Sequence, residues 1–256
     1  MLLAQLSDLH VGLPGSKVDL AYESAARLER AVAHVCALDP RPDAVVLTGD
    51  LVNDGTPAEY ARLAALLAPL PMPVYVLPGN HDDREHLRAA FAARGYLPPR
   101  GPLCYAVDVG PLRLLALDTN VPGQPSGRLE AQQLAWLDAR LAEARARPTL
   151  LALHHPPFRT GIQRADDEMG LSGAEALEAV VRRHPQVERI LCGHLHRPIV
   201  SRFAGTLAAT CPSTMHQLQL DLRERGRLAL VPEPPALLLH LWREGEGLVT
   251  HTSYVR

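Results

Sequence analysis

Five short segments of the chain carry side chains that can bind metal ions. Their donor atoms are carboxylate and amide oxygens and imidazole nitrogens, a mixture that suits Mn²⁺, Fe²⁺ or Zn²⁺ better than Ca²⁺, which takes oxygen ligands only. Thiolates are absent from all five, which argues against a structural zinc site. In chain order, the segments are Asp8-Leu9-His10, Gly49-Asp50, Gly79-Asn80-His81-Asp82, His154-His155-Pro156-Pro157 and Gly193-His194-Leu195-His196.

The spacing of these residues indicates a centre that holds two metal ions. Asp8 and His10 lie two positions apart, as do His194 and His196, and in extended backbone such side chains point to the same side. A carboxylate such as that of Asp50 can bridge two cations through its two oxygens. Two divalent cations held by two carboxylates keep a net positive charge. Such a centre could bind a phosphate ester and stabilise both the attacking and the leaving oxygen.

Each segment taken alone has a simpler explanation. The D-x-H and G-D patterns are common in surface loops and turns, and a pair of histidines can be bonded to the backbone. The set as a whole favours a functional site, because every segment follows an apolar stretch that is typical of a buried strand. Strands that end in polar residues are expected at 2–7, 43–50, 74–82, 149–157 and 187–198.

Amphipathic stretches alternate with these strands. Two adjacent strands are also expected at 105–109 and 112–119. The alternation of strands and helices predicts an α/β layered fold, in which ligands lie beyond the carboxyl ends of the strands. Helices are expected at 19–38, from a capping box at Thr56 to about 69, near 83–94, at 129–146 and at 173–184.

The overall composition excludes several classes of protein. Charged residues make up 21% of the 256 residues and the net charge is −2, so we expect no polymeric nucleic acid as a partner. No apolar run reaches ~18 residues and the N-terminus does not resemble a signal peptide, so we expect no membrane partner. The scattered cysteines indicate reduced thiols and a cytoplasmic location. They are Cys36, Cys104, Cys192 and Cys211.

In this order, the five segments resemble the signature of the calcineurin-like metallophosphoesterase superfamily. The motifs D-x-H, G-D, G-N-H-D, H-H-P-P and G-H-x-H span residues 8–196. The resemblance implies a four-layer α/β/β/α sandwich with two mixed β-sheets. We therefore expect a single metallophosphoesterase domain over residues 1–256, in which the strand-rich part 198–256 completes the second sheet or forms a cap.

The resemblance also implies which residues would bind two divalent metal ions, either Mn, Fe or Zn. Asp50 would bridge them. His154 is preferred over its neighbour His155, which stays the alternative. One metal would be held by Asp8, His10, Asp50 and His196, and the other by Asp50, Asn80, His154 and His194.

Three further residues are expected around the substrate. By the resemblance, His81 lies near the phosphate and the leaving group, where it and Asn80 could stabilise developing charge, and His81 could donate a proton. Protein phosphatases of the superfamily have an aspartate where this chain has Asn53, which could orient the imidazole of His81 but could not stabilise its charged form. His216 is expected to contact the substrate, with a structural role as the alternative.

A closer resemblance is to class III cyclic nucleotide phosphodiesterases and the related glycerophosphodiesterases. It is carried by residues 77–83, 211–217 and the C-terminal tail. It implies a dinuclear metal-dependent phosphodiesterase that hydrolyses small phosphodiesters, such as 3′,5′-cyclic nucleotides, by attack of a metal-bridging hydroxide. The alternatives are a phosphomonoesterase or nucleotidase with the same site, a glycerophosphodiesterase and, more remotely, a catalytically silent metal-binding scaffold. The relatives also suggest a homodimer.

Overall fold

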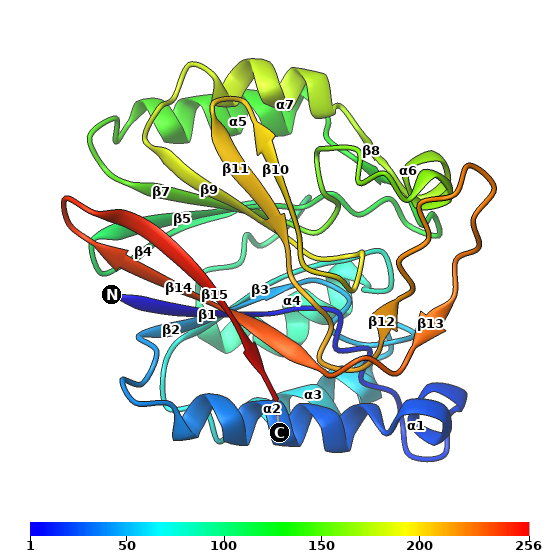
Figure 1. Ribbon diagram of the computed structural model, residues 1–256. Helices are drawn as coiled ribbons and strands as arrows, with labels where there is room; N and C mark the ends of the chain where they lie inside the picture. The colour runs from blue at the N-terminus through cyan, green and yellow to red at the C-terminus, as the bar shows by residue number, and fades with distance from the viewer. Residues whose placement is uncertain (256) are drawn as a thin grey trace.

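Two mixed β-sheets pack face to face, and helices cover the outer face of each (Figure 1). This arrangement is seen in the computed structural model, which describes residues 1–255. The predicted four-layer α/β/β/α sandwich is thereby confirmed.

The first sheet has the strand order β15-β14-β1-β2-β3. Its centre is parallel, since β1 pairs with β2 and β2 with β3 in the same direction. The C-terminal hairpin adds the two antiparallel strands beside β1. The strands are β1 (Leu2–Leu6), β2 (Ala44–Thr48), β3 (Val74–Leu77), β14 (Ala236–Arg243) and β15 (Gly247–Tyr254).

The second sheet has the order β10-β11-β9-β7-β5-β4. Its four inner strands are parallel, and the strand at each edge is antiparallel to its neighbour. The strands are β4 (Tyr105–Val109), β5 (Leu112–Leu117), β7 (Thr149–Leu153), β9 (Val187–Cys192), β10 (Ile199–Phe203) and β11 (Thr206–Thr210).

Helices cover the outer face of each sheet through amphipathic surfaces. Leu28, Leu63 and Leu87 pack with strand residues of the first sheet, whereas Leu137 and Leu177 pack with those of the second. No helix within residues 1–255 is long and apolar enough to cross a bilayer. The helices are α1 (Lys17–Tyr22), α2 (Ser24–Ala37), α3 (Pro57–Leu67), α4 (Arg84–Phe91), η1 (Ala92–Arg94), α5 (Ala131–Ala142), α6 (Gln163–Glu168) and α7 (Ala174–Val181).

The helix boundaries differ from the expected ones most at two places. The helix expected at 19–38 is two helices, because Glu23 adopts a left-handed conformation with φ 51° that ends α1 before α2 begins. The helix expected at 129–146 spans only Ala131–Ala142. The capping box at Thr56 forms as expected, since its side chain accepts a hydrogen bond from Glu59 N and the Glu59 carboxylate accepts one from Thr56 N.

The C-terminal strands contribute to both sheets. β10 and β11 extend the second sheet, whereas β14 and β15 extend the first. Two short strand pairs lie outside the sheets, β6 (Gly127–Arg128) with β8 (Leu171–Ser172) and β12 (Gln217–Leu218) with β13 (Leu230–Val231). In Figure 1, α1, α6 and the β12–β13 pair gather at the right, beyond the carboxyl ends of the parallel strands. These elements therefore surround the end of the sandwich where a site is expected.

Candidate metal centre and catalytic pocket

The five polar segments follow the carboxyl ends of β1, β2, β3, β7 and β9, and the fold brings them together. Two groups of buried residues result, and within each the possible ligand atoms lie within 4.8 Å of one another. One group contains Asp8, His10, Asp50 and His196, and the other contains His154, His155 and His194.

Most of these residues have an uncommon backbone conformation. Seven non-glycine residues of the described chain have positive φ, and five of them are Asp8, His10, Asp50, His194 and His196. Left-handed backbone is costly for such residues and collects at functional sites, where the surrounding structure enforces it. The expectation of extended backbone at the D-x-H and H-x-H segments is therefore wrong, because the chain turns at each of these positions.

In the first group, the two histidines contact the carboxylates of Asp50 and Asp8. Nε2 of His10 lies 3.2 Å from Nε2 of His196 and 3.6 Å from Oδ2 of Asp50. Nε2 of His196 lies 3.4 Å from Oδ1 of Asp8, while its Nδ1 pairs with the backbone oxygen of His216 at 3.0 Å. Each imidazole thus directs one nitrogen at the carboxylates.

The second group meets the first at the same carboxylate. Nε2 of His154 lies 3.4 Å from Oδ2 of Asp50 and 3.2 Å from Oδ1 of Asn80, and its Nδ1 pairs with the backbone oxygen of Thr48 at 2.8 Å. Nε2 of His194 contacts the backbone oxygen of Met169 at 3.0 Å, so Nδ1 is the nitrogen left for a ligand. Asp50 therefore lies between the two groups.

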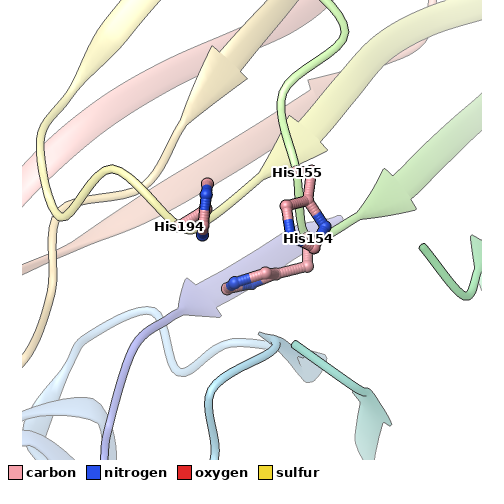
Figure 2. A group of neighbouring side chains, drawn as sticks. All are labelled: His154, His155 and His194. Carbon is pink, nitrogen blue, oxygen red and sulfur yellow. The ribbon is translucent and has the colours of Figure 1, made fainter. Parts of the chain in front are cut away.

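His155 is close to this group but its nitrogens are engaged elsewhere. Figure 2 shows its ring beside those of His154 and His194. Nδ1 of His155 pairs with Oγ1 of Thr119 at 2.7 Å, and Nε2 lies 3.2 Å from the backbone oxygen of Pro125. His155 lies close to His154 and His194, but both of its ring nitrogens form hydrogen bonds, so neither is available to bind a metal ion.

The charges in the centre also favour bound cations. Burial raises the pKa of Asp8, whereas the imidazoles of His154 and His10 hold the pKa of Asp50 well below its usual range although burial opposes this. Burial lowers the pKa of His194 to about 3 and that of His10 well below its usual value, so both rings keep free lone pairs. Among the described residues, the ion pairs of the two carboxylates are formed by histidines, with no lysine or arginine. This buried set of oxygens and imidazole nitrogens fits two divalent cations.

A pocket of about 480 Å³ opens over the centre. His81 and Asn80 line it, and His81 N donates to Oδ1 of Asp50 at 2.9 Å. Nδ1 of His81 lies 2.8 Å from the backbone oxygen of Asn53, whose side chain instead donates to Asp54. Asn53 therefore orients the imidazole through its carbonyl and not through its amide. The other walls are formed by Lys17, Val18, Ala21, Tyr22, Met169, Met215, His216, Leu218 and Leu230.

His216 lies in the wall of this pocket. The centroid of its ring lies 4.5 Å from that of the Tyr22 ring and 4.7 Å from that of the His196 ring. Burial and the neighbouring His196 lower the pKa of His216 to about 3, so the ring is neutral. Its Nδ1 is buried and has no hydrogen-bond partner within residues 1–255.

A sixth polar strand end, which is not among the five predicted segments, also supports the site. Asp118, Thr119 and Asn120 follow β5. The Asn120 amide donates to the backbone oxygens of Gly79 and Asp82 at 2.8 and 2.7 Å, and so holds the loop that carries Asn80 and His81. The signal was present, because this segment follows an apolar strand in the same way as the other five.

Comparison with known proteins identifies the family. Residues 1–198 match the family described as calcineurin-like phosphoesterase. The chain belongs to this family. It is 35% identical to a probable glycerophosphodiester phosphodiesterase of Arcobacter nitrofigilis over 258 residues, covering 100% of this chain and 93% of that protein. It is 34% identical to a 3′,5′-cyclic adenosine monophosphate phosphodiesterase of Pseudomonas aeruginosa, covering 85% of this chain and 77% of that one.

A solved structure supports the same fold. A dimetal phosphatase from Danio rerio superposes with a TM-score of 0.71 at 17% identity, covering 100% of this chain and 99% of that one. Family membership confirms the predicted superfamily and the predicted class of enzyme, a metal-dependent hydrolase of phosphoric esters.

Proposed function

We propose that this calcineurin-like phosphoesterase is a dinuclear metal-dependent phosphodiesterase that hydrolyses small phosphodiesters such as 3′,5′-cyclic nucleotides. One observation carries the proposal. The Oδ2 atom of Asp50 lies 3.6 Å from Nε2 of His10 and 3.4 Å from Nε2 of His154, so a single carboxylate faces both groups of imidazoles.

The proposed ligands follow from which atoms are free. Asp8, His10, Asp50 and His196 would hold one ion, and Asp50, Asn80, His154 and His194 the other. His154 is chosen because its Nε2 faces Asp50 and Asn80, whereas both nitrogens of His155 are engaged. The bound ions would supply Lewis acidity that polarises the phosphoryl group and acidifies water. Whether Mn, Fe or Zn occupies the sites depends on supply in the cell as well as on affinity.

His81 is the proposed catalytic residue outside the ligand set. Its position is fixed by two bonds, from its backbone N to Asp50 and from Nδ1 to the Asn53 carbonyl, so Nε2 is left for the substrate. A protonated ring can donate to the oxygen of the leaving group, and a neutral ring can orient the substrate. Because a carbonyl and not a carboxylate faces Nδ1, the charged form gains less stabilisation than it would beside an aspartate.

The pocket walls favour a diester over a simple monoester. Val18, Tyr22, Leu218 and Leu230 give the walls apolar and aromatic surface that can contact an organic substituent on the phosphate. Lys17 is the one lysine or arginine among the lining residues of this pocket, so the walls offer few cationic side chains to the second negative charge of a monoester. His216, whose ring faces Tyr22, is a proposed substrate contact.

A glycerophosphodiester is the second candidate substrate, because the relative in Arcobacter nitrofigilis that carries this name aligns with the whole chain. A phosphomonoesterase with the same centre and a silent scaffold are less favoured. A homodimer and a cytoplasmic location remain predictions, as does a single domain over residues 1–256. The domain prediction is supported by the pairing of β1 from the N-terminus with both β2 and the C-terminal β14.

Hydrolysis of a small substrate panel by Mn²⁺-loaded protein tests this proposal. The panel contains cyclic AMP, glycerophosphoethanolamine, bis(p-nitrophenyl) phosphate and p-nitrophenyl phosphate. We expect diesters to be preferred, cyclic AMP over glycerophosphoethanolamine, and all activity to disappear with a chelator. Preference for the monoester, or full activity after metal removal, would contradict the proposal.

A further inference from the structure

A buried amide crosses the space between the two sheets directly behind the candidate metal centre. Gln5 of β1 is fully buried on the inner face of the first sheet. Its Nε2 donates to Oγ1 of Thr48 at 3.0 Å and to the backbone oxygen of Cys192 at 2.9 Å. Thr48 ends β2 and Cys192 ends β9, so one side chain joins a strand of each sheet.

Both joined strands lead directly into candidate ligands. Thr48 is followed by Gly49 and Asp50, and Cys192 is followed by Gly193 and His194. The backbone oxygen of Thr48 also accepts from Nδ1 of His154 at 2.8 Å. The amide of Gln5 therefore contacts the same residue whose carbonyl orients His154, and the two residues that it bonds, Thr48 and Cys192, each lie two positions before a candidate ligand.

The two sheets approach closely at this point. His194 N, after β9 of the second sheet, donates to the carboxylate oxygens of Asp8, after β1 of the first sheet, at 3.0 and 3.1 Å. A Cβ added at Gly193 would collide with Oγ of Ser7 and lie 2.7 Å from the backbone oxygen of Thr48. Because the sheets are so closely packed here, a change in their separation would move the candidate ligands of both groups.

The orientation of the Gln5 amide is fixed by a chain of buried hydrogen bonds. Nε2 of His240 lies 3.0 Å from Oε1 of Gln5, and Nδ1 of His240 lies 2.9 Å from Oγ1 of Thr250. Nη1 of Arg189 donates to the same Thr250 oxygen at 3.0 Å. Because the backbone oxygen of Cys192 can only accept, the other directions follow in turn: Nε2 of Gln5 donates to Cys192, Nε2 of His240 donates to Oε1 of Gln5, and Thr250 donates to Nδ1 of the neutral His240.

A flipped amide would break this chain at both ends. Nε2 of Gln5 would then face the N–H of His240, and Oε1 would face the backbone oxygen of Cys192. Both are pairs of like groups in a buried place, where an unmatched polar group is costly. Burial and the nearby Arg189 lower the pKa of His240 to about 3, so the ring has one N–H to donate.

We propose that Gln5 and His240 are positioning residues that form a cross-sheet clamp, defined as the bonds from His240 to Gln5 and from Gln5 to Thr48 and Cys192. The clamp sets the separation of Asp50 and His154, which come from different sheets, and so the spacing of the two metal ions. The inference rests on the proposed function, because it requires a dinuclear centre.

Replacement of His240 tests the clamp with a matched pair of variants. His240→Leu removes the donor to Gln5, whereas His240→Gln keeps an N–H that can donate to Oε1. Gln5→Leu removes the clamp itself. His184→Gln is the control for loss of a buried histidine, since His184 is 2% exposed, pairs with Asp138 at 2.7 Å and precedes β9 at the end opposite His194.

The readouts are Mn²⁺ affinity by calorimetry and the electron paramagnetic resonance spectrum of the coupled Mn²⁺ pair, neither of which depends on turnover. We expect His240→Leu and Gln5→Leu to bind Mn²⁺ about 10-fold more weakly, the lower end of the range for removal of a direct partner of a metal ligand, because Gln5 acts on the ligands through Thr48 and Cys192. Their spectra should show altered coupling. His240→Gln and His184→Gln should resemble the unaltered protein in both readouts.

The outcomes separate failure of the clamp from failure of the metal centre. If the unaltered protein binds two Mn²⁺ ions and His240→Leu does so with the same affinity and spectrum, the clamp is wrong and the proposed function stands. If His240→Leu only lowers the melting temperature, as His184→Gln does, the clamp is also wrong. If the unaltered protein binds no Mn²⁺, both proposals are wrong.

Discussion

Asp50 and His154 come from different sheets, and Oδ2 of Asp50 lies 3.4 Å from Nε2 of His154. Asp50 follows β2 of the first sheet, and His154 follows β7 of the second. The candidate centre is therefore built across the boundary between the two sheets. Its geometry depends on how the sheets pack, as well as on the residues that bind.

Replacing the central carboxylate should affect both metal ions. Asp50→Asn keeps the shape of the side chain but removes its charge and one of its oxygens. Because Asp50 faces both groups of imidazoles, we expect both bound metals to be lost at micromolar concentrations and hydrolysis to disappear. Metal analysis after gel filtration measures this. Asp108→Asn, at an exposed carboxylate, is the control and should keep both ions.

The two adjacent histidines should behave differently. His154→Ala removes a nitrogen that faces Asp50 and Asn80, so we expect one of the two ions to be lost. His155→Ala removes only bonds to Thr119 and Pro125 and should keep both ions, with reduced stability. Metal content of the two proteins, measured together, decides between them. Loss of an ion from His155→Ala alone would reverse the assignment.

Replacement of His81 should separate catalysis from metal binding. His81→Ala removes the side chain beside the phosphate but keeps the backbone N–H that bonds Asp50. If the ring donates a proton, turnover should fall by roughly 10²–10⁴. Two ions per chain should remain bound. A fall in turnover near 10² would agree with the Asn53 carbonyl as the partner of the His81 ring. Loss of metal would show that His81 has another role.

Stability should fall on acidification because of His240. Its pKa is about 3 in the folded chain, where burial disfavours the charged form, and near 6.5 when unfolded. The unfolded state therefore binds more protons between these values, so the contribution of a neutral His240 is complete above pH 6.5 and is lost as the pH falls toward 3. Between pH 7 and 5 the loss is about 2 kcal/mol.

The comparison with His240→Gln isolates this effect. Urea unfolding in the presence of a chelator, at pH 7 and pH 5, gives the free energy of unfolding of each protein. The variant lacks the titrating ring, so it should lose about 2 kcal/mol less than the unaltered chain. An equal loss in both proteins would mean that His240 is not held neutral in the fold.

The polar residues of the centre could be predicted because each follows an apolar strand directly. Asp8 and Asp50 are close in space for the reason the sequence suggested, since the carboxyl ends of parallel strands in one sheet meet, and the packing of the second sheet on the first brings His194 to them. Their backbone could not be predicted in the same way. The left-handed conformation at these positions is enforced by contacts between segments far apart in sequence.

Other features depend on contacts that no local pattern reveals. Gln5 and His240 are 235 positions apart, and each resembles an ordinary strand residue until the sheet aligns β1 with β14. His81 contacts the backbone carbonyl of Asn53 and not its side chain. The type of residue at position 53 therefore gives no information about this contact. The break at Glu23 has no glycine or proline to mark it, and a continuous amphipathic pattern runs across it.

The central claim is that two metal ions share the carboxylate of Asp50. Anomalous diffraction from crystals grown with Mn²⁺ tests it directly. We predict two anomalous peaks, one beside Asp8, His10 and His196 and one beside Asn80, His154 and His194, with Asp50 between them. A single peak, or a second peak bound by His155 and not in contact with Asp50, would contradict the claim.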